Sequence, residues 1–234
     1  MDHQQPPSTV PQLIAETVVP ASTTTPVPEG DTKRPPVSGP QPPSNIAIEI
    51  TTDANDALVA SLTGIVNQVY FDTEKDLFLE GTQRTDEQEV RSIMQAGELA
   101  VMYILPPPDP QAATAQPPPR KAVGCIRIRR FADDVGELGM LALAPSHQGG
   151  GMGSALMRFG EGHVRGTLGL PVARLELLVP SGFHHAFKAR LQAWYEKMGY
   201  RVVRLGVFQD EYPKAAALLR GPTEYRVFEK TLGA

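Results

Sequence analysis

Residues 141–154 read LALAPSHQGGGMGS, and they predict a strand, a tight turn and the start of a helix. The apolar run ends at Pro145, and the glycine-rich turn leads directly into residues 155–159. The first turn of a helix carries N–H groups without a backbone partner and the positive end of the helix dipole. Glycine lets the turn come close to a ligand and adopt positive φ. The stretch therefore predicts a site for an anion, typically a phosphate or pyrophosphate.

Three families of phosphate-binding turn compete for this stretch, and the spacing of the glycines separates them. The Walker loop needs a lysine directly after its second glycine, but Gly153 is followed by Ser154 and no lysine lies nearby. The dinucleotide fingerprint Gly-x-Gly-x-x-Gly can begin at Gly149 and continue through Gly151, but Ser154 replaces its third glycine. Glu176 lies about where that fingerprint expects an acidic residue. A nucleotide-linked oxidoreductase that binds NAD therefore stays open as an alternative.

The third pattern, Gln/Arg-x-x-Gly-x-Gly/Ala after a strand with a proline near its end, is matched in full. Its positions are Gln148, Gly151 and Gly153, with Pro145 three residues before the glutamine. It resembles the acyl-CoA loop of the GNAT superfamily of N-acetyltransferases. Residues 191–200, LQAWYEKMGY, are similar to that family's helix ending in Tyr-x-x-x-Gly-Phe/Tyr, and residues 137–141, ELGML, to its central fourth strand. The resemblance covers about residues 46–232.

The resemblance implies a fold and an activity. The expected fold is α/β, an α+β sandwich with a mixed, mostly antiparallel central sheet flanked by helices and with the acyl-CoA in an opening between strands four and five. The expected activity is transfer of an acetyl group from acetyl-CoA, as co-substrate and without a metal, to a primary amine. The amine, of a small molecule or of a peptide or protein, would attack directly in a ternary complex. A glycine turn without any ligand is the plain structural alternative.

Two side chains are the expected catalytic residues. The resemblance places Tyr195 beside the CoA sulfur as the general acid for the leaving thiolate; packing of helix on sheet is its structural alternative. Glu137 lies eleven residues before Gln148, which matches the general-base glutamate of the histone-acetylating branch of the superfamily. On an extended strand, Glu137, Gly139 and Leu141 share a face, which would point Glu137 into the substrate cleft. The alternative for Glu137 is a solvated charge.

The resemblance assigns cofactor contacts mainly to backbone groups. The N–H of Leu141 would act as the oxyanion donor, and Leu143 would pair with the pantetheine arm. The pyrophosphate would be bound by the turn residues Gln148, Gly149, Gly150, Gly151, Met152, Gly153 and Ser154.

The chain departs from the family at one position. Many relatives carry an asparagine seven residues before the catalytic tyrosine, where this chain has Lys188. Lys188 could meet a CoA phosphate or lie in solvent. Its presence is the only support in the sequence for a second function of another class, a non-catalytic acyl-CoA-binding or scaffold module.

Other reactive residue types suit structural roles better. Cys125, on an apolar strand with no histidine close in sequence, is expected to be a buried small hydrophobe. His184 and His185 have no ligand spacing for zinc and are expected to cap a helix or face solvent. The basic residues of 127–130 are expected to be a solvated strand end. In this fold the acceptor pocket corresponds to residues 71–90 and 206–226, whose acidic and aromatic residues suit a cationic amine.

Composition divides the chain into a leader and one domain. Of the 23 prolines, eleven lie in residues 1–44 and seven in 106–119. We predict a disordered Pro/Thr/Ser-rich leader over 1–44 and a domain over 45–234 with a Pro-rich loop insertion at 106–120. Strands are expected at 46–51, 99–105, 121–130, 135–144, 172–179, 200–208 and 224–231, and helices at 54–72, 86–96, 151–166 and 186–198, with a short one within 210–220. Asp53 or Asn55 is expected to cap the first helix.

Charge and cysteine content limit the partners. A net charge of −4 and a pI of about 5.8 give no electrostatic reason to bind nucleic acid. No apolar run approaches the length of a membrane span, no targeting signal stands out, and a single cysteine fits a reducing compartment. The sequence therefore predicts a cytoplasmic protein, monomer or homodimer, without nucleic-acid or membrane partners.

Overall fold

The computed structural model describes residues 42–106 and 120–233 of the chain. Most of the predicted leader and nearly all of the predicted loop insertion at 106–120 lie outside the described residues, so both stay predictions.

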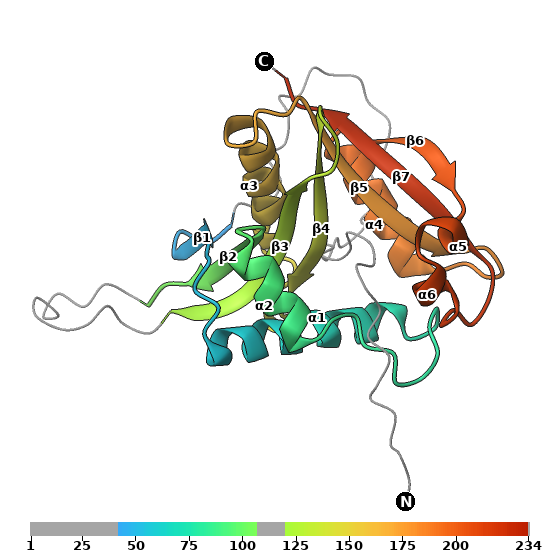
Figure 1. The fold of residues 1–234 in the computed structure, drawn as a ribbon, viewed down its shortest axis with the longest axis horizontal. Helices are drawn as coiled ribbons and strands as arrows, with labels where there is room; N and C mark the ends of the chain where they lie inside the picture. Colours follow the sequence, from blue (N-terminus) through green and yellow to red (C-terminus); the bar gives the residue numbers. More distant parts are fainter. Residues whose placement is uncertain (1–41, 107–119, 234) are drawn as a thin grey trace, which may run out of the picture.

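A seven-stranded mixed sheet forms the centre of the described part (Figure 1). Its strands are β1 (Ile46–Ile50), β2 (Leu99–Ile104), β3 (Lys121–Arg130), β4 (Val135–Leu143), β5 (Val172–Pro180), β6 (Arg201–Gly206) and β7 (Thr223–Thr231). The strands lie in the order β1-β2-β3-β4-β5-β7-β6, and every pair is antiparallel except β4 with β5. This is the predicted fold class, and it differs from the parallel sheet of dinucleotide-binding domains.

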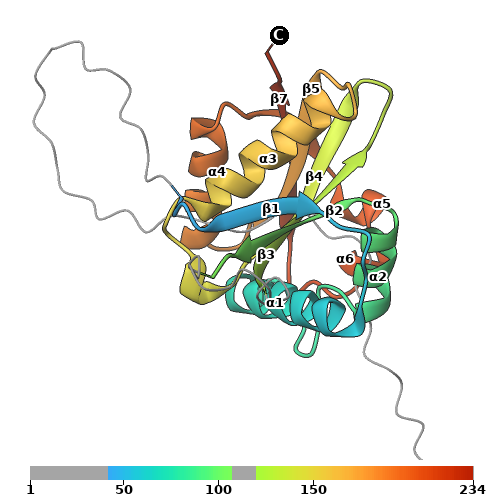
Figure 2. The same ribbon diagram turned by 90° about the vertical axis from the view of Figure 1, so that its left-hand side faces the viewer.

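Helices cover both faces of the sheet (Figure 2). They are α1 (Asp56–Glu74), α2 (Glu87–Gln95), α3 (Met152–Gly166), α4 (Ala186–Lys197), and two short helices, α5 (Phe208–Glu211) and α6 (Pro213–Ala216). One core cluster joins α3 and α4 to the sheet, and a second joins α1 and α2 to its opposite face. A third cluster packs α5 and α6 against β5 and β7 on the side of α1.

The helix starts follow the local sequence. The side chain of Asn55 accepts the N–H of Leu58 and so caps α1, which decides between the two predicted caps. Asp86 caps α2 in the same way. The imidazole of His185 accepts the N–H of Lys188 at the start of α4, as expected of a capping residue. The predicted elements are confirmed, except that two short helices replace the single one expected within 210–220.

The strands β4 and β5 separate after a short paired stretch. Only residues 135–137 of β4 pair with residues 172–174 of β5. Beyond these pairs the two strands diverge, as Figure 1 shows. Helix α3 packs closely on β4. A Cβ atom added at Gly160 would lie only 2.8 Å from the side chain of Leu138, so glycine permits this approach. The opening between strands four and five is therefore present as predicted.

Candidate active site

A β-bulge interrupts β4 inside the opening. Cys125 of β3 faces Ala142 and Arg127 faces Gly139, so the one residue between them opposes two on β4. One of these two, Met140, has φ of 48°, a left-handed conformation that is uncommon for a residue other than glycine. The bulge leaves backbone groups of β4 outside the regular ladder, at the place where the sequence predicts an oxyanion donor at Leu141.

The bulge also corrects one sequence expectation. A regular strand would put Glu137 and Leu141 on the same face. In the structure Met140 packs in the core beneath α1 and α2, whereas Leu141 packs in the core beneath α3 and α4. The expectation that Glu137 and Leu141 share a face was wrong. The extra residue at the bulge shifts the alternation of side chains between the two sheet faces by one residue, so Leu141 lies on the face opposite to Glu137.

The predicted phosphate-binding turn ends at an uncapped helix start. Gly149 and Gly151 have positive φ, 94° and 79°, and Gly151 is the N-cap of α3 with no side-chain cap. The side-chain amide of Gln148 donates to the carbonyl oxygen of Leu143 at 3.0 Å and so holds the turn against the end of β4. Among the described residues no side chain occupies the helix start, and its N–H groups suit an anion.

Tyr195 lies on the face of α4 that packs against the sheet. Its side chain is fully buried, and its ring contacts Trp194, Tyr200 and Phe228. Burial, and the nearby Tyr70, Tyr200 and Glu74, raise the pKa of Tyr195 well above the ordinary tyrosine value. The phenol is therefore protonated at neutral pH and retains a proton to donate.

Lys188 forms a buried ion pair that the sequence did not reveal. Its ammonium donates to the carboxylate of Glu74 at 2.7 Å, and the two residues are 0% and 5% exposed. The expectation that Lys188 could lie in solvent was wrong. The pair joins residues 114 positions apart, and no local pattern signals such a distant contact. Burial raises the pKa of Glu74 and lowers the pKa of Lys188.

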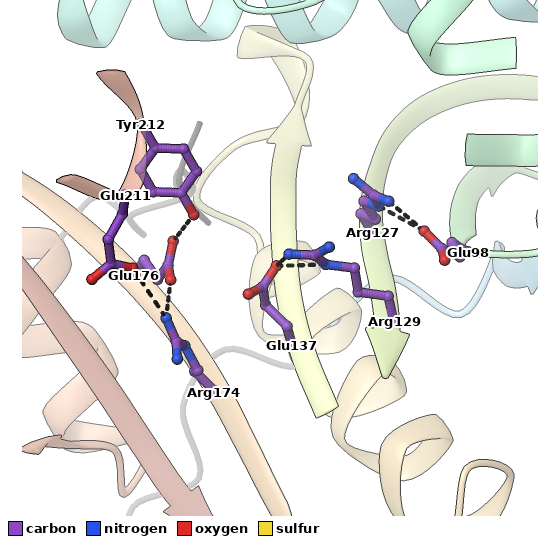
Figure 3. A network of polar contacts seen from close by, with 8 residues as sticks. All are labelled: Glu98, Arg127, Arg129, Glu137, Arg174, Glu176, Glu211 and Tyr212. Atoms are coloured by element: carbon purple, nitrogen blue, oxygen red, sulfur yellow. Dashed lines mark hydrogen bonds and ion pairs between the residues drawn. The ribbon is translucent and has the colours of Figure 1, made fainter. Parts of the chain in front are cut away.

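Glu137 is held on the face of the sheet by Arg129 of β3, at 2.8 Å (Figure 3). Its side chain is 13% exposed, so it is not the solvated charge of the alternative interpretation. Burial and the nearby charge of Glu176 raise the pKa of Glu137, against the opposing charge of Arg129. Its Oε2 is buried and accepts no hydrogen bond from the described part of the chain. A carboxylate of this kind can accept a proton.

Charged groups continue on both sides of Glu137 on the same sheet face. On β3, Arg127 pairs with Glu98. On β5, Arg174 pairs with Glu176, whose other oxygen accepts the Tyr212 hydroxyl at 2.7 Å (Figure 3). The expectation that the arginines of 127–130 are simply solvated was therefore wrong for the two that point to this face.

Comparison with known proteins finds a family model that matches part of the chain. Residues 113–202 match the family model of the acetyltransferase (GNAT) domain. Over these residues the chain is similar to GNAT acetyltransferases. No curated relative matches the sequence.

Solved structures share the GNAT fold at low sequence identity. An aminoglycoside 6'-N-acetyltransferase complexed with coenzyme A is 16% identical, with a TM-score of 0.54, over 80% of this chain and 98% of that one. The NatC complex bound to Gag peptide and CoA is 15% identical, with a TM-score of 0.50, over 81% and 99%. N-acetylglutamate synthase from Neisseria gonorrhoeae, complexed with coenzyme A and N-acetyl-glutamate, is 14% identical with a TM-score of 0.50. The match covers 81% of this chain but only 35% of that synthase.

A cavity of about 360 Å³ lies at the C-terminal end of α1. Its walls come from α1, from the segment that follows it and from Arg220. It occupies the first region that the sequence predicts for the acceptor, residues 71–90. Sequence reasoning missed Tyr70 and Arg84, which also line it, because Tyr70 lies just before that region and only the acidic and aromatic residues within the region were considered.

The remaining candidates are structural. Cys125 is buried, and burial raises its pKa to about 12, as suits a small hydrophobe and not a nucleophile.

Within residues 42–106 and 120–233 no three His, Cys, Asp or Glu residues are grouped to hold a metal ion. No helix in those ranges is long and apolar enough to cross a membrane.

The buried pair predicts an asymmetric response to mutation. Lys188→Met leaves Glu74 buried without its partner, so the free energy of unfolding at pH 7 should fall by about 3–5 kcal/mol. The double variant Glu74→Gln with Lys188→Met removes both charges and should recover most of that loss. In the single variant, Glu74 has a raised pKa in the folded state, so the stability of the single variant relative to the double variant should be highest below about pH 4 and should fall as the pH rises. Urea unfolding at several pH values measures both effects, and equal stability of the single and double variants would contradict them.

Proposed function

We propose that the chain is an N-acetyltransferase that moves the acetyl group of acetyl-CoA to a primary amine of a small molecule or a peptide. The observation that carries the proposal is the opening between β4 and β5. The glycine turn follows β4, and the helix that carries Tyr195 follows β5, so both motifs begin at the ends of the separated strands. The CoA-bound neighbours support the same cofactor for this fold.

The residues of the opening fit an acyl-CoA. The turn from Gln148 through Ser154 would bind the pyrophosphate, because positive φ at two glycines and an uncapped helix start leave N–H donors open there. Leu143 would pair with the pantetheine arm. The N–H of Leu141, in the bulge, would stabilise the oxyanion.

The chemistry needs a base for the amine and an acid for the thiolate. An alkyl ammonium has a pKa of about 10.4, so the amine must lose a proton before it attacks. Glu137 would accept that proton, directly or through one water, before the amine nitrogen bonds to the carbonyl carbon. The carbon–sulfur bond then breaks, Tyr195 would donate its phenolic proton to the leaving sulfur, and the nitrogen would release its second proton to solvent as the amide forms. Exchange of protons with solvent then restores the carboxylate of Glu137 and the phenol of Tyr195.

The proposed setting is the cytoplasm, with the chain as a monomer or homodimer.

Binding of acetyl-CoA is the first test. Calorimetric titration into the 234-residue chain should show binding, and Gly151→Val should weaken it by about tenfold or more, because a branched residue is strained at positive φ and crowds the turn. Gly162→Val, at an exposed helical position with open space around it, is the matched control. Unchanged affinity in Gly151→Val would show that the pyrophosphate binds elsewhere. Binding without thiol release for any amine would favour the non-catalytic module.

Tyr195→Phe tests the general acid. Loss of the hydroxyl should lower kcat by about 10²-fold, the lower end of the general-acid effect, while acetyl-CoA affinity stays nearly unchanged. Tyr200→Phe makes the same change in an adjoining buried ring, 6.2 Å away between centroids, and should lower kcat much less. Thiol release and calorimetry give the two readouts. An equal loss of kcat in both variants, or a joint loss of affinity, would make Tyr195 a packing residue.

Glu137→Gln tests the general base. In the unmodified chain kcat/KM should rise with pH through an apparent pKa above the ordinary glutamate value, because the pKa of Glu137 is raised. The variant should lose that rise and about 10²-fold in kcat/KM. Glu98→Gln removes the carboxylate of another arginine pair on this face, that of Arg127, and serves as the control. An unchanged pH profile in Glu137→Gln would exclude Glu137 as the base.

A further inference from the structure

The cavity at the end of α1 carries charges of both signs. Three acidic, three basic and four apolar or aromatic residues are among those that line it: Glu74, Asp76 and Glu80; Lys75, Arg84 and Arg220; and Tyr70, Phe71, Phe78 and Leu79. Its volume of about 360 Å³ lies at the small end of the range of ligand pockets. A small molecule with both charges and an apolar part matches such walls better than a purely cationic one.

Arg84 is the least satisfied of these residues. It is 7% exposed, yet its Nε and Nη1 make no hydrogen bond within the part of the chain that the structure describes. The residue is nevertheless fixed in place. Its backbone N–H donates to Asn67 at 2.9 Å, and its guanidinium lies 5.1 Å from the centre of the Tyr70 ring. A buried guanidinium with open donors favours an anionic ligand such as a carboxylate.

Glu74 connects the same cavity to the proposed catalytic helix. It lines the cavity, and its Oε1 accepts the ammonium of Lys188 on α4. Lys188 precedes Tyr195 by seven residues, two helical turns, so both lie on one face of α4. A carboxylate offers about four acceptor sites, and Lys188 uses one of them. Glu74 can therefore also accept a hydrogen bond from a substrate ammonium group.

We propose that the acceptor is an amino acid or an amino-acid-like molecule, whose carboxylate binds Arg84 and whose amine binds Glu74 on the side of Tyr195. This inference rests on the proposed N-acetyltransferase function and specifies its substrate class. A carboxylate suits the cavity better than a phosphate, because the walls carry as many acidic as basic residues and so do not favour a doubly charged anion. The aromatic and aliphatic wall residues favour an apolar side chain on the acceptor. A peptide amine lacks the adjacent free carboxylate and fits less well.

Matched amine pairs test the carboxylate. With the full chain and acetyl-CoA, thiol release should give a kcat/KM for L-phenylalanine about tenfold or more above that for phenethylamine, which lacks only the carboxylate; leucine and isoamylamine form a second pair. Arg84→Met should raise KM for the amino acids by about tenfold or more and leave the decarboxylated amines nearly unchanged. Arg84→Lys, which keeps the charge but loses the fork, should fall between the two.

Two controls distinguish failure of this inference from failure of the proposed acetyltransferase function. Acetyl-CoA affinity, measured by calorimetry, should be unchanged in both Arg84 variants, because Arg84 does not belong to the proposed cofactor site. If no amine supports thiol release, the proposed acetyltransferase function is wrong. Calorimetric titration of phenylalanine in the presence of CoA then still tests whether the cavity binds an amino acid. Preference for decarboxylated or peptide amines, equal effects of Arg84→Met on both members of a pair, or no binding of phenylalanine in that titration would each overturn the inference.

Discussion

The separation of β4 from β5 is the constraint on which the site depends. Three residue pairs hold the two strands together at one end, and none continues the ladder beyond them. Backbone groups along the diverging edges are left without strand partners, and in a folded protein such groups need another partner. The opening therefore favours an extended ligand with amide groups of its own. Because the glycine turn and α4 follow these two strands, their motifs converge on the same opening.

The ion pair between Glu74 and Lys188 links the two sides of this opening. Glu74 ends α1 and Lys188 belongs to α4, so the pair joins the helices of opposite sheet faces. Desolvation of two charges costs several kcal/mol for each ion, and their attraction repays that cost only in part. A pair of isosteric apolar residues would stabilise the fold at least as well. The charges are thus better explained by the cavity that Glu74 lines and by the proposed catalytic role of α4.

The face of the sheet beneath α1 and α2 differs in character along its strands. Where α1 crosses β3 and β4, the residues are apolar, as at Cys125, Met140 and Ala142. Toward the paired ends of β4 and β5, the same face carries Glu137 and its charged neighbours (Figure 3). Burial and Glu176 raise the pKa of Glu137, and the charges of Arg129 and Arg174 oppose that rise. A carboxylate with a raised pKa suits acceptance of a proton.

The sequence by itself determined the succession of strands and helices along the chain, the glycine turn and the position of Tyr195 on its helix, because periodicity, capping residues and turn glycines act over a few residues. The expected fold came from the resemblance of its motifs to the GNAT superfamily. It did not determine which face Leu141 occupies, since the bulge depends on how β3 and β4 meet. The partner of Lys188, the environment of Glu137 and the open donors of Arg84 were also decided only by tertiary structure. Each of these depends on residues far apart in the chain, and burial, which sets their pKa values and hydrogen-bonding needs, exists only once the layers have packed.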